Sequence, residues 1–141
     1  MIMRKVALAL IKRGDKYLVE KFYDEVDKVY FYKLIGGAIE EGETPKEALS
    51  REFMEELKSK ICEIKNFAVI LDKVKYNGTD REIEAHILEA NFEDEYDSRF
   101  TQKFIYSLEG KFLSIAMWKS LDEIKSENLI LYPRSLIELL K

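Results

Sequence analysis

The sequence predicts a layered domain of the α/β (α+β) class. Its 141 residues are about the length of one domain. Hydrophobic residues make up 47% of the chain and charged residues 35%, a composition that supports a folded core and disfavours disorder. Segments with strand-like composition alternate with segments that carry helix-start signals. We therefore expect a single domain over residues 1–141, in which β-structure packs against helices.

Strand-like segments fill the first third of the chain. Residues 5–11 are rich in Val, Ala, Leu and Ile, and residues 17–23 follow a hairpin-turn signal at Gly14-Asp15. Residues 28–34, with the sequence KVYFYKL, combine β-branched and aromatic side chains. Such side chains suit a half-buried strand, so we expect three strands in this region.

A loop and a strongly signalled helix follow. We expect a glycine-punctuated loop over residues 36–43. Thr44 can cap a helix, Pro45 suits the first helical position, and Glu47 completes a capping box. Good helix formers then continue without interruption, which predicts a helix as far as about Lys58.

The second half of the chain predicts more strands and two short helices. Three strands are expected, over residues 61–75, 82–92 and 111–118. The first two surround an Asn77-Gly78 turn, and residues 92–98 form an acidic connection. One helix opens at Ser120, and a last helix starts at Pro133. The apolar stripe of that last helix consists of Leu136, Ile137, Leu139 and Leu140.

The helix that begins at Pro45 gathers carboxylates along one edge. At 3.6 residues per turn, Glu52, Glu55 and Glu56 fall within an arc of about 100°. The adjoining apolar stripe, which is the natural buried face, consists of Leu49, Phe53 and Leu57. Like charges three or four residues apart destabilise a helix, so this edge needs a counter-charge. Arg51 supplies part of it, and a divalent cation such as Mg²⁺ would supply the rest. A solvated acidic face is the alternative.

These positions fit a known motif. Gly37, five residues, Glu43, seven residues and then Arg51-Glu52-Phe53-Met54-Glu55-Glu56 resembles the Nudix box, G-x5-E-x7-R-E-U-x-E-E-x-G-U. The segment over residues 37–59 departs from this pattern at its end. Lys58 stands where the family has glycine, and Ser59 stands where it has an aliphatic residue. Neither departure removes a metal-ligand position.

The resemblance implies a fold, an activity and a cofactor. The fold is the Nudix fold, a mixed β-sheet sandwiched between α-helices. The activity is that of a pyrophosphohydrolase on phosphoric anhydride bonds, which cleaves a nucleoside diphosphate linked to another group X with Mg²⁺ or Mn²⁺. A nucleoside triphosphate, as for MutT-like enzymes, is favoured by the compact length. ADP-ribose and dinucleoside polyphosphates stay open, because loops outside the box select X.

The resemblance also assigns roles to residues. The positions that match metal-binding carboxylates are Glu52, Glu55 and Glu56. The backbone carbonyl of Gly36 joins them in this family. Arg51 matches the arginine that orients the catalytic glutamates, with Glu43 as its partner. The catalytic base lies in the box or outside it, and outside it we nominate Glu82 or Glu84. Ordinary exposed strand glutamates are the alternative for both.

Two aromatic residues outside the box offer a substrate contact. Tyr30 and Tyr32 share one face of the predicted strand that precedes the box, and that face suits stacking on a base. Core packing is the alternative. We therefore group these tyrosines with Glu82 and Glu84 as substrate-binding candidates.

Composition restricts the other classes of function. One cysteine and one histidine exclude an internal disulfide and metal centres built on several such ligands, and they disfavour an isoprenoid diphosphate isomerase on the same fold. A net charge of −4 gives no basic footprint for duplex nucleic acid. No apolar run approaches the roughly 18 residues of a membrane span. We expect a cytoplasmic monomer or homodimer that acts on a small nucleotide-like substrate. A Nudix-fold sensor that binds a nucleotide without turnover is the alternative.

Overall fold

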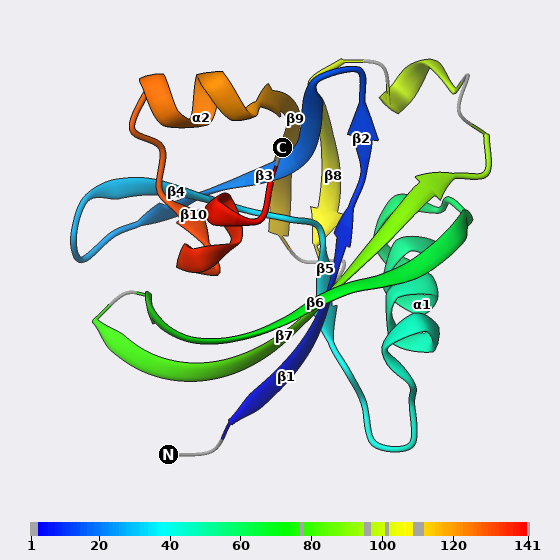
Figure 1. Ribbon diagram of the computed structural model, residues 1–141, viewed down its shortest axis with the longest axis horizontal. Coiled ribbons are helices and arrows are strands. Elements are labelled where there is room, and N and C mark those ends of the chain that lie inside the picture. The colour runs from blue at the N-terminus through cyan, green and yellow to red at the C-terminus, as the bar shows by residue number, and fades with distance from the viewer. Residues whose placement is uncertain (1–2, 77, 95–96, 101, 109–111, 141) are drawn as a thin grey trace.

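The computed structural model describes residues 3–76, 78–94, 97–100, 102–108 and 112–140 (Figure 1). The strands are β1 (Arg4–Leu10), β2 (Lys12–Arg13), β3 (Lys16–Asp24), β4 (Val29–Lys33), β5 (Gly36–Ala38), β6 (Ile61–Tyr76), β7 (Thr79–Phe92), β8 (Phe104–Leu108), β9 (Phe112–Ser120) and β10 (Leu131–Tyr132). The α-helices are α1 (Pro45–Leu57) and α2 (Leu121–Ser126), and the 3₁₀ helices are η1 (Ser98–Phe100) and η2 (Arg134–Glu138).

The strands form two mixed sheets. The four-stranded sheet has the order β5-β1-β7-β6, in which β1 and β7 run parallel. The six-stranded sheet has the order β10-β4-β3-β9-β8, with β2 paired to β3 and β10 parallel to β4. Helix α1 lies at one side of the molecule and α2 at the other (Figure 1). The arrangement is of the α+β class, which confirms the predicted class.

Two hydrophobic clusters fill the core. The first joins α1 to both sheets, with Leu49 and Phe53 packed against Ala7 of β1 and Leu18 of β3. The second contains Val6 and Leu8 of β1 and lies on the other face of the four-stranded sheet. Strand alternation explains this division, because successive residues of β1 point to opposite faces. Helix α1 is therefore anchored by its apolar stripe, and its carboxylate edge lies beside the six-stranded sheet.

Local signals placed several elements correctly. Gly14 adopts a positive φ of 59° in the turn between β2 and β3, as the hairpin signal predicts. The capping box of α1 is present, with the Thr44 hydroxyl accepting from the Glu47 backbone N–H. The helix ends at Leu57, and Lys58 takes the left-handed conformation with φ 52°. The box position occupied by Lys58 is thus one whose backbone suits glycine, which explains the family preference.

The structure corrects three expectations. Residues 36–38 are not loop but β5, because Gly36 lies so close to β1 that their backbones pair. The last helix is only the short 3₁₀ helix η2, and of its predicted stripe Leu136 and Leu140 alone are buried. Strand β8 was not predicted at all, although its aromatic and β-branched residues carry a strand signal.

Some predicted positions lie outside the described residues. These are Asn77 of the predicted turn, Glu95 and Tyr96 of the acidic connection, and Lys111 at the start of the strand that is observed as β9. Across the described ranges, no helix combines the length and apolarity that crossing a membrane requires.

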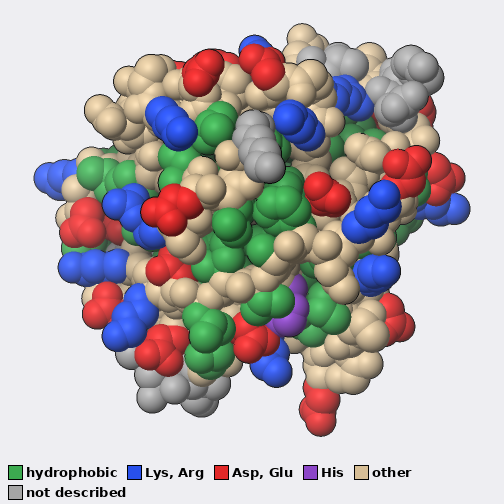
Figure 2. Space-filling view, viewed as in Figure 1, with side chains coloured by type: hydrophobic (Ala, Val, Ile, Leu, Met, Phe, Trp, Pro, Cys, Tyr) green, Lys and Arg blue, Asp and Glu red, His purple; other side chains and the backbone are tan. Residues whose placement is uncertain are grey.

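Charged side chains of both signs surround the face shown in Figure 2, and hydrophobic side chains gather at its middle. Acidic and basic groups are interspersed over this face.

Candidate active site

The glycines of β5 bring the backbone close to α1 and β1. A side chain at Gly36 would overlap the Ala7 carbonyl group of β1. A Cβ atom at Gly37 would lie 2.6–2.8 Å from the carboxylate atoms of Glu52. Only glycine therefore fits at Gly36, where the overlap is with backbone, whereas a side chain at Gly37 would displace the Glu52 carboxylate from its observed position.

Arg51 holds three glutamates of the box region in one hydrogen-bonded group, which we call the Arg51 cluster (Arg51, Glu43, Glu52 and Glu55). Arg51 Nε and Nη2 donate to the two Glu43 carboxylate oxygens at 2.7 and 2.9 Å. Its Nη1 donates to Glu52 Oε1 at 3.0 Å and to Glu55 Oε2 at 3.2 Å. Its Nη2 also donates to the Ala38 carbonyl oxygen at 3.0 Å. The planar guanidinium thus joins the box loop to the box helix.

The hydrogen bonds of this group shift pKa values in the expected directions. The Arg51 hydrogen bonds hold the pKa of Glu43 below its ordinary value. The same pairing, chiefly with Glu43, raises the pKa of Arg51. Both groups are therefore charged at any working pH, and Arg51 does not serve as a proton carrier.

A second group lies deeper, where α1 meets the six-stranded sheet. We call Glu20, Glu56 and Lys33 the buried carboxylate cluster. Glu20 is fully buried and Glu56 is 8% exposed. Both carboxylate oxygens of Glu20 and the Oε2 atom of Glu56 have no hydrogen-bond partner. The nearest cation is Lys33, whose Nζ lies 3.5 Å from Glu20 Oε1. Such unsatisfied buried groups are rare in proteins and need an explanation.

Burial and like charge explain the protonation of this cluster. Burial, a hydrogen bond with Glu52 and the charges of Glu52 and Glu20 raise the pKa of Glu56 to about 9. Burial raises the pKa of Glu20 to about 7, although Lys33 opposes the shift. At neutral pH and without a bound cation, Glu56 is therefore protonated, whereas Glu20 beside Lys33 is partly ionised.

The donor set suits a hard divalent cation. Carboxylate oxygens are the ligands that Mg²⁺ and Mn²⁺ prefer, and the orphaned Oε2 atom of Glu56 is an oxygen that such a cation would satisfy. As the side chains lie, no three Asp, Glu, His or Cys groups in the described part of the chain form a metal-binding set. Glu55 is 60% exposed at its side chain and is turned to Arg51, so joining such a set requires a change of its rotamer.

A cleft of about 610 Å³ opens beside these carboxylates. Its lining includes Gly37 and Ser114, the cations Arg4, Lys21, Lys33 and Arg81, and the aromatic residues Phe22, Tyr23, Phe31 and Tyr132. Phe22 and Phe31 stack with ring centroids 5.3 Å apart, and Tyr132 meets Phe31 edge-on at 5.5 Å. We call this the cationic cleft. Its volume lies within the roughly 300–1,000 Å³ of small-molecule sites.

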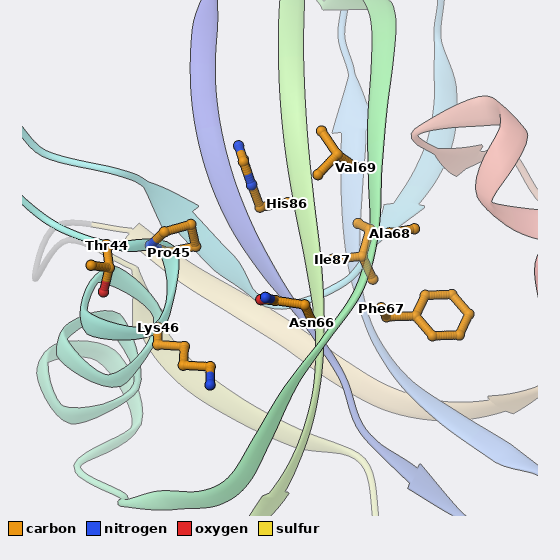
Figure 3. Close-up of a pocket in the computed structure, with 9 residues that line it drawn as sticks. All are labelled: Thr44, Pro45, Lys46, Asn66, Phe67, Ala68, Val69, His86 and Ile87. Atoms are coloured by element: carbon orange, nitrogen blue, oxygen red, sulfur yellow. The ribbon is translucent and has the colours of Figure 1, made fainter.

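A smaller hollow of about 350 Å³ lies at the N-terminal end of α1 (Figure 3). Thr44, Pro45 and Lys46 face it from the helix, and residues 66–69 of β6 with His86 and Ile87 of β7 form its other side. The three box glutamates line neither hollow. The cationic cleft, however, is lined by Gly37, which lies against the Glu52 carboxylate, and by Lys33, which pairs with Glu20, whereas the smaller hollow is lined by neither. We therefore place the candidate site at the cationic cleft.

The structure separates the other predicted residues from the box. Tyr32 is buried in the second core cluster, whereas Tyr30 is 55% exposed and contacts Tyr23 and Lys21. Glu82 and Glu84 alternate on β7 with Arg81 and Ile83, which line the cationic cleft, so they point to the other face of the sheet.

The Glu84 carboxylate is paired with the side chains of His86 and Lys5. Its Oε2 atom lies 2.8 Å from His86 Nε2 and 4.0 Å from Lys5 Nζ. The His86 hydrogen bond holds the pKa of Glu84 below its ordinary value. A carboxylate with a lowered pKa is a weaker base, so the surroundings of Glu84 do not favour a role as the catalytic base.

Sequence reasoning missed four residues that the structure brings to this region. Phe31, between the two predicted tyrosines, lines the cleft with Phe22. Glu20 and Lys33 lie opposite each other in the β3–β4 register. The one signal for Glu20 in the sequence was that a charged residue interrupts the apolar run of β3. That signal does not show which strand pairs with β3, so Lys33 could not be identified as its partner.

Comparison with known proteins places this geometry in a family. The model of the NUDIX domain matches residues 2–140. A NUDIX hydrolase from Nitrosomonas europaea aligns with a TM-score of 0.68 and 19% identity, over 98% of this chain and 86% of that one. A MutT NUDIX hydrolase from Burkholderia pseudomallei aligns with a TM-score of 0.66 and 20% identity, over 99% and 97%.

A further structural neighbour is a MutT protein from Bacillus halodurans, with a TM-score of 0.62 and 17% identity over 96% of this chain and 80% of that one. At these identities the neighbours establish the fold, which is the predicted Nudix fold. Among curated proteins, none matches the chain. The match over nearly all of the chain supports the expected hydrolase of phosphoric anhydride bonds, and it establishes that the chain belongs to the NUDIX domain family.

Proposed function

We propose that this protein is a divalent-cation-dependent pyrophosphohydrolase that cleaves a nucleoside diphosphate linked to another group, with a nucleoside triphosphate as the favoured substrate. The observation that carries the proposal is the unsatisfied buried carboxylate cluster beside the cationic cleft. Carboxylates would hold the cation on one side, while the cleft would receive the charged nucleotide on the other. Because strands of both sheets line the cleft, we further propose that residues 1–141 act as one domain.

Mg²⁺ or Mn²⁺ is the proposed cofactor. Glu52 and Glu56 would hold it, with Glu55 after a change of rotamer and with the Gly36 carbonyl oxygen. When bound, the cation neutralises phosphate oxygens and the charge that develops during phosphoryl transfer. Binding would also offset the burial and the like charge that raise the pKa of Glu56 in the protein alone.

Arg51 and Glu43 would hold the metal-binding glutamates of the box in fixed positions. The guanidinium fixes Glu52 directly and is itself fixed by two hydrogen bonds from Arg51 to Glu43. A planar fork restricts the rotation of the carboxylate that it binds, which a lysine would not do. We therefore assign Arg51 a positioning role, and Glu43 a supporting one.

The reaction requires a proton acceptor. Water attacks one phosphorus atom, a new P–O bond forms, and the anhydride P–O bond breaks as the leaving phosphate departs. A carboxylate that the cation leaves free accepts the proton of the water. We favour a glutamate of the box for this role over Glu82 or Glu84, because Glu84 is held by His86 and Lys5 on the other face of the sheet.

The cationic cleft would bind the rest of the nucleotide. Aromatic rings offer a stacking surface that accepts any base, and here the half-buried Phe22, which stacks on the buried Phe31, would supply it. Lysine and arginine side chains around the cleft would meet the phosphates. Tyr32 stays a weaker candidate for substrate contact because it is in the core, and Tyr30 because it does not line the cleft.

A substrate panel tests the proposal. Nucleoside triphosphates, ADP-ribose and dinucleoside polyphosphates are incubated with Mg²⁺ or Mn²⁺. Released phosphate or pyrophosphate is measured for the triphosphates, and a phosphatase-coupled phosphate assay is used for ADP-ribose and the dinucleoside polyphosphates, whose products are phosphate monoesters. We expect turnover that chelation with EDTA abolishes. The Glu52→Gln/Glu56→Gln variant is the matched control. Tight nucleotide binding without turnover would support a sensor and contradict the proposal.

A further inference from the structure

Glu20 and Lys33 form an ion pair that the family motif does not include. The β3–β4 register places the two residues opposite each other, so both side chains point to the same face of the six-stranded sheet. Lys33 Nζ lies 3.5 Å from Glu20 Oε1. Among the described residues, this is the only ion pair of Glu20.

The two members of the pair have very different surroundings. Glu20 is fully buried and neither of its oxygens is hydrogen-bonded. The Lys33 side chain is 33% exposed and lines the cationic cleft beside Gly37 and Ser114. Its ammonium group also lies 5.0 Å from the centroid of the Phe22 ring. The Lys33 ammonium group is thus held by the Glu20 carboxylate and by the face of the Phe22 ring, and it remains accessible from the cleft.

Stability alone does not account for this arrangement. A buried ion pair gains Coulomb energy but loses hydration, and apolar residues of similar volume serve a core equally well. Glu20 also adds negative charge beside Glu52 and Glu56, which costs further free energy. A buried ion pair that carries this free-energy cost, and whose cation faces a cleft, favours a role in binding an anion.

We propose that Lys33 binds the phosphate oxygens of the substrate and that Glu20 is the positioning residue that holds Lys33 toward the cleft. The inference rests on the proposed function of the same site and deepens it. A lysine is a compact point charge on a flexible stem, so an anchor is required if its ammonium is to keep one position. Glu20 supplies that anchor from a rigid strand, where its carboxylate cannot reach water.

The experiment measures phosphate binding directly, without turnover. Imidodiphosphate, a pyrophosphate analogue with a P–N–P bridge, is titrated calorimetrically into the full chain with Mg²⁺ present. The variants are Lys33→Met, Lys33→Arg, Glu20→Gln and the Lys33→Met/Glu20→Gln double variant. Lys119→Met and Glu127→Gln are the controls, because this lysine–glutamate pair (3.3 Å) lies on and next to β9 outside the cleft. Thermal melts check that each variant is folded.

We expect Lys33→Met to weaken imidodiphosphate binding by at least about tenfold and Glu20→Gln by about three- to tenfold. Lys33→Arg should restore most of the binding. The double variant should bind as Lys33→Met does, because Glu20 acts through Lys33 and the two losses are then not additive. Both control variants should bind as the wild type does.

Four results would overturn the proposal. One is imidodiphosphate binding by Lys33→Met that is as tight as in the wild type, and a second is a failure of the wild type to bind it at all. A third is additive losses in the double variant. The fourth is a Mn²⁺ dissociation constant, measured by electron paramagnetic resonance, that rises tenfold or more in Glu20→Gln, since Glu20 would then be a metal ligand. A wild type that binds imidodiphosphate but hydrolyses no nucleotide would contradict the proposed function and leave the role of Lys33 and Glu20 in binding intact.

Discussion

The Arg51 cluster and the buried carboxylate cluster both contain glutamates of α1, but they differ in how far the negative charge of these glutamates is balanced. In the first, one guanidinium fork satisfies Glu43, Glu52 and Glu55 near the surface. In the second, a single lysine lies at 3.5 Å from a buried carboxylate, and three carboxylate oxygens are left without hydrogen bonds. The first cluster is complete as it is, whereas the second requires more positive charge. This difference supports our proposal that cation and substrate bind at the deeper cluster and that the outer one has a positioning role.

The largest expected effect comes from removing a carboxylate of the deeper cluster. Glu56→Gln should lower kcat by at least about a hundredfold, or roughly 2.7 kcal/mol in the activation barrier, because a cation ligand is lost. Steady-state assays of the folded variant measure this. Glu63→Gln, an exposed change on β6, is the control and should keep full activity. Wild-type turnover by Glu56→Gln would remove Glu56 from the site.

The outer cluster should give a smaller, purely kinetic effect. Arg51→Lys keeps the charge and loses the fork, so kcat should fall by about ten- to a hundredfold while metal affinity changes little. Kinetics and metal titration on the same preparation separate the two quantities. A kinetically silent Arg51→Lys would make Arg51 an ordinary surface ion-pair residue.

These two clusters also differ in how far the sequence predicted them. The Thr44 cap fixes where α1 begins, and the resemblance to the Nudix box implied that Arg51 orients the glutamates with Glu43 as its partner. The pairing of Glu20 with Lys33 depends on the β3–β4 register, and the electrostatic interaction of Glu20 with Glu56 depends on how α1 packs on that sheet. Periodicity within one segment carries no information on sheet register or on helix packing. Of the deeper cluster, sequence reasoning therefore found Glu56 but not Glu20 or Lys33.

The same limit applies to the fold. Strands with uniform apolar or aromatic runs and helices with capping boxes were predicted near their observed bounds. Sheet partners were not, because parallel pairing of β1 with β7 joins segments far apart in the chain. Residues 36–38 illustrate the point: the glycines signal a break locally, but the neighbouring backbone of β1 makes them a strand.

Metal should stabilise the protein through the deeper cluster. At a concentration of about 100 times the dissociation constant, a ligand that binds only the folded form adds about 2.7 kcal/mol. Mg²⁺ or Mn²⁺ should therefore raise the Tm by several degrees. In Glu52→Gln/Glu56→Gln the response should be smaller, and the variant should be at least as stable as the wild type without metal. A wild-type Tm that does not depend on metal would argue against the site.

The metal-free protein should lose stability as the pH rises. The pKa of Glu56 is about 9 and that of Glu20 about 7 in the folded protein, against an ordinary value of 4.5. Between these values the folded form holds protons that the unfolded chain has released. Stability is therefore greatest below about pH 4.5 for these groups and is lost as the pH rises through 7 and 9, by at most about 1.4 kcal/mol per pH unit for each proton.

Urea unfolding at pH 5, 7 and 9 in EDTA measures this slope in the wild type and in Glu56→Gln. Carboxylates with a lowered pKa, such as Glu43, change stability only under more acidic conditions, so they do not obscure the comparison. The slope should be shallower in Glu56→Gln. Equal slopes in the two proteins would show that Glu56 is ionised in the folded state.

The most direct test of the account is a Mn²⁺ titration followed by electron paramagnetic resonance, because it asks whether the deeper cluster binds a cation without requiring the substrate to be known. The wild type and Glu63→Gln should bind Mn²⁺ with the same dissociation constant. In Glu56→Gln that constant should rise by at least about tenfold. Equal Mn²⁺ affinity in the wild type and Glu56→Gln would contradict the assignment of the buried carboxylate cluster as the cation site.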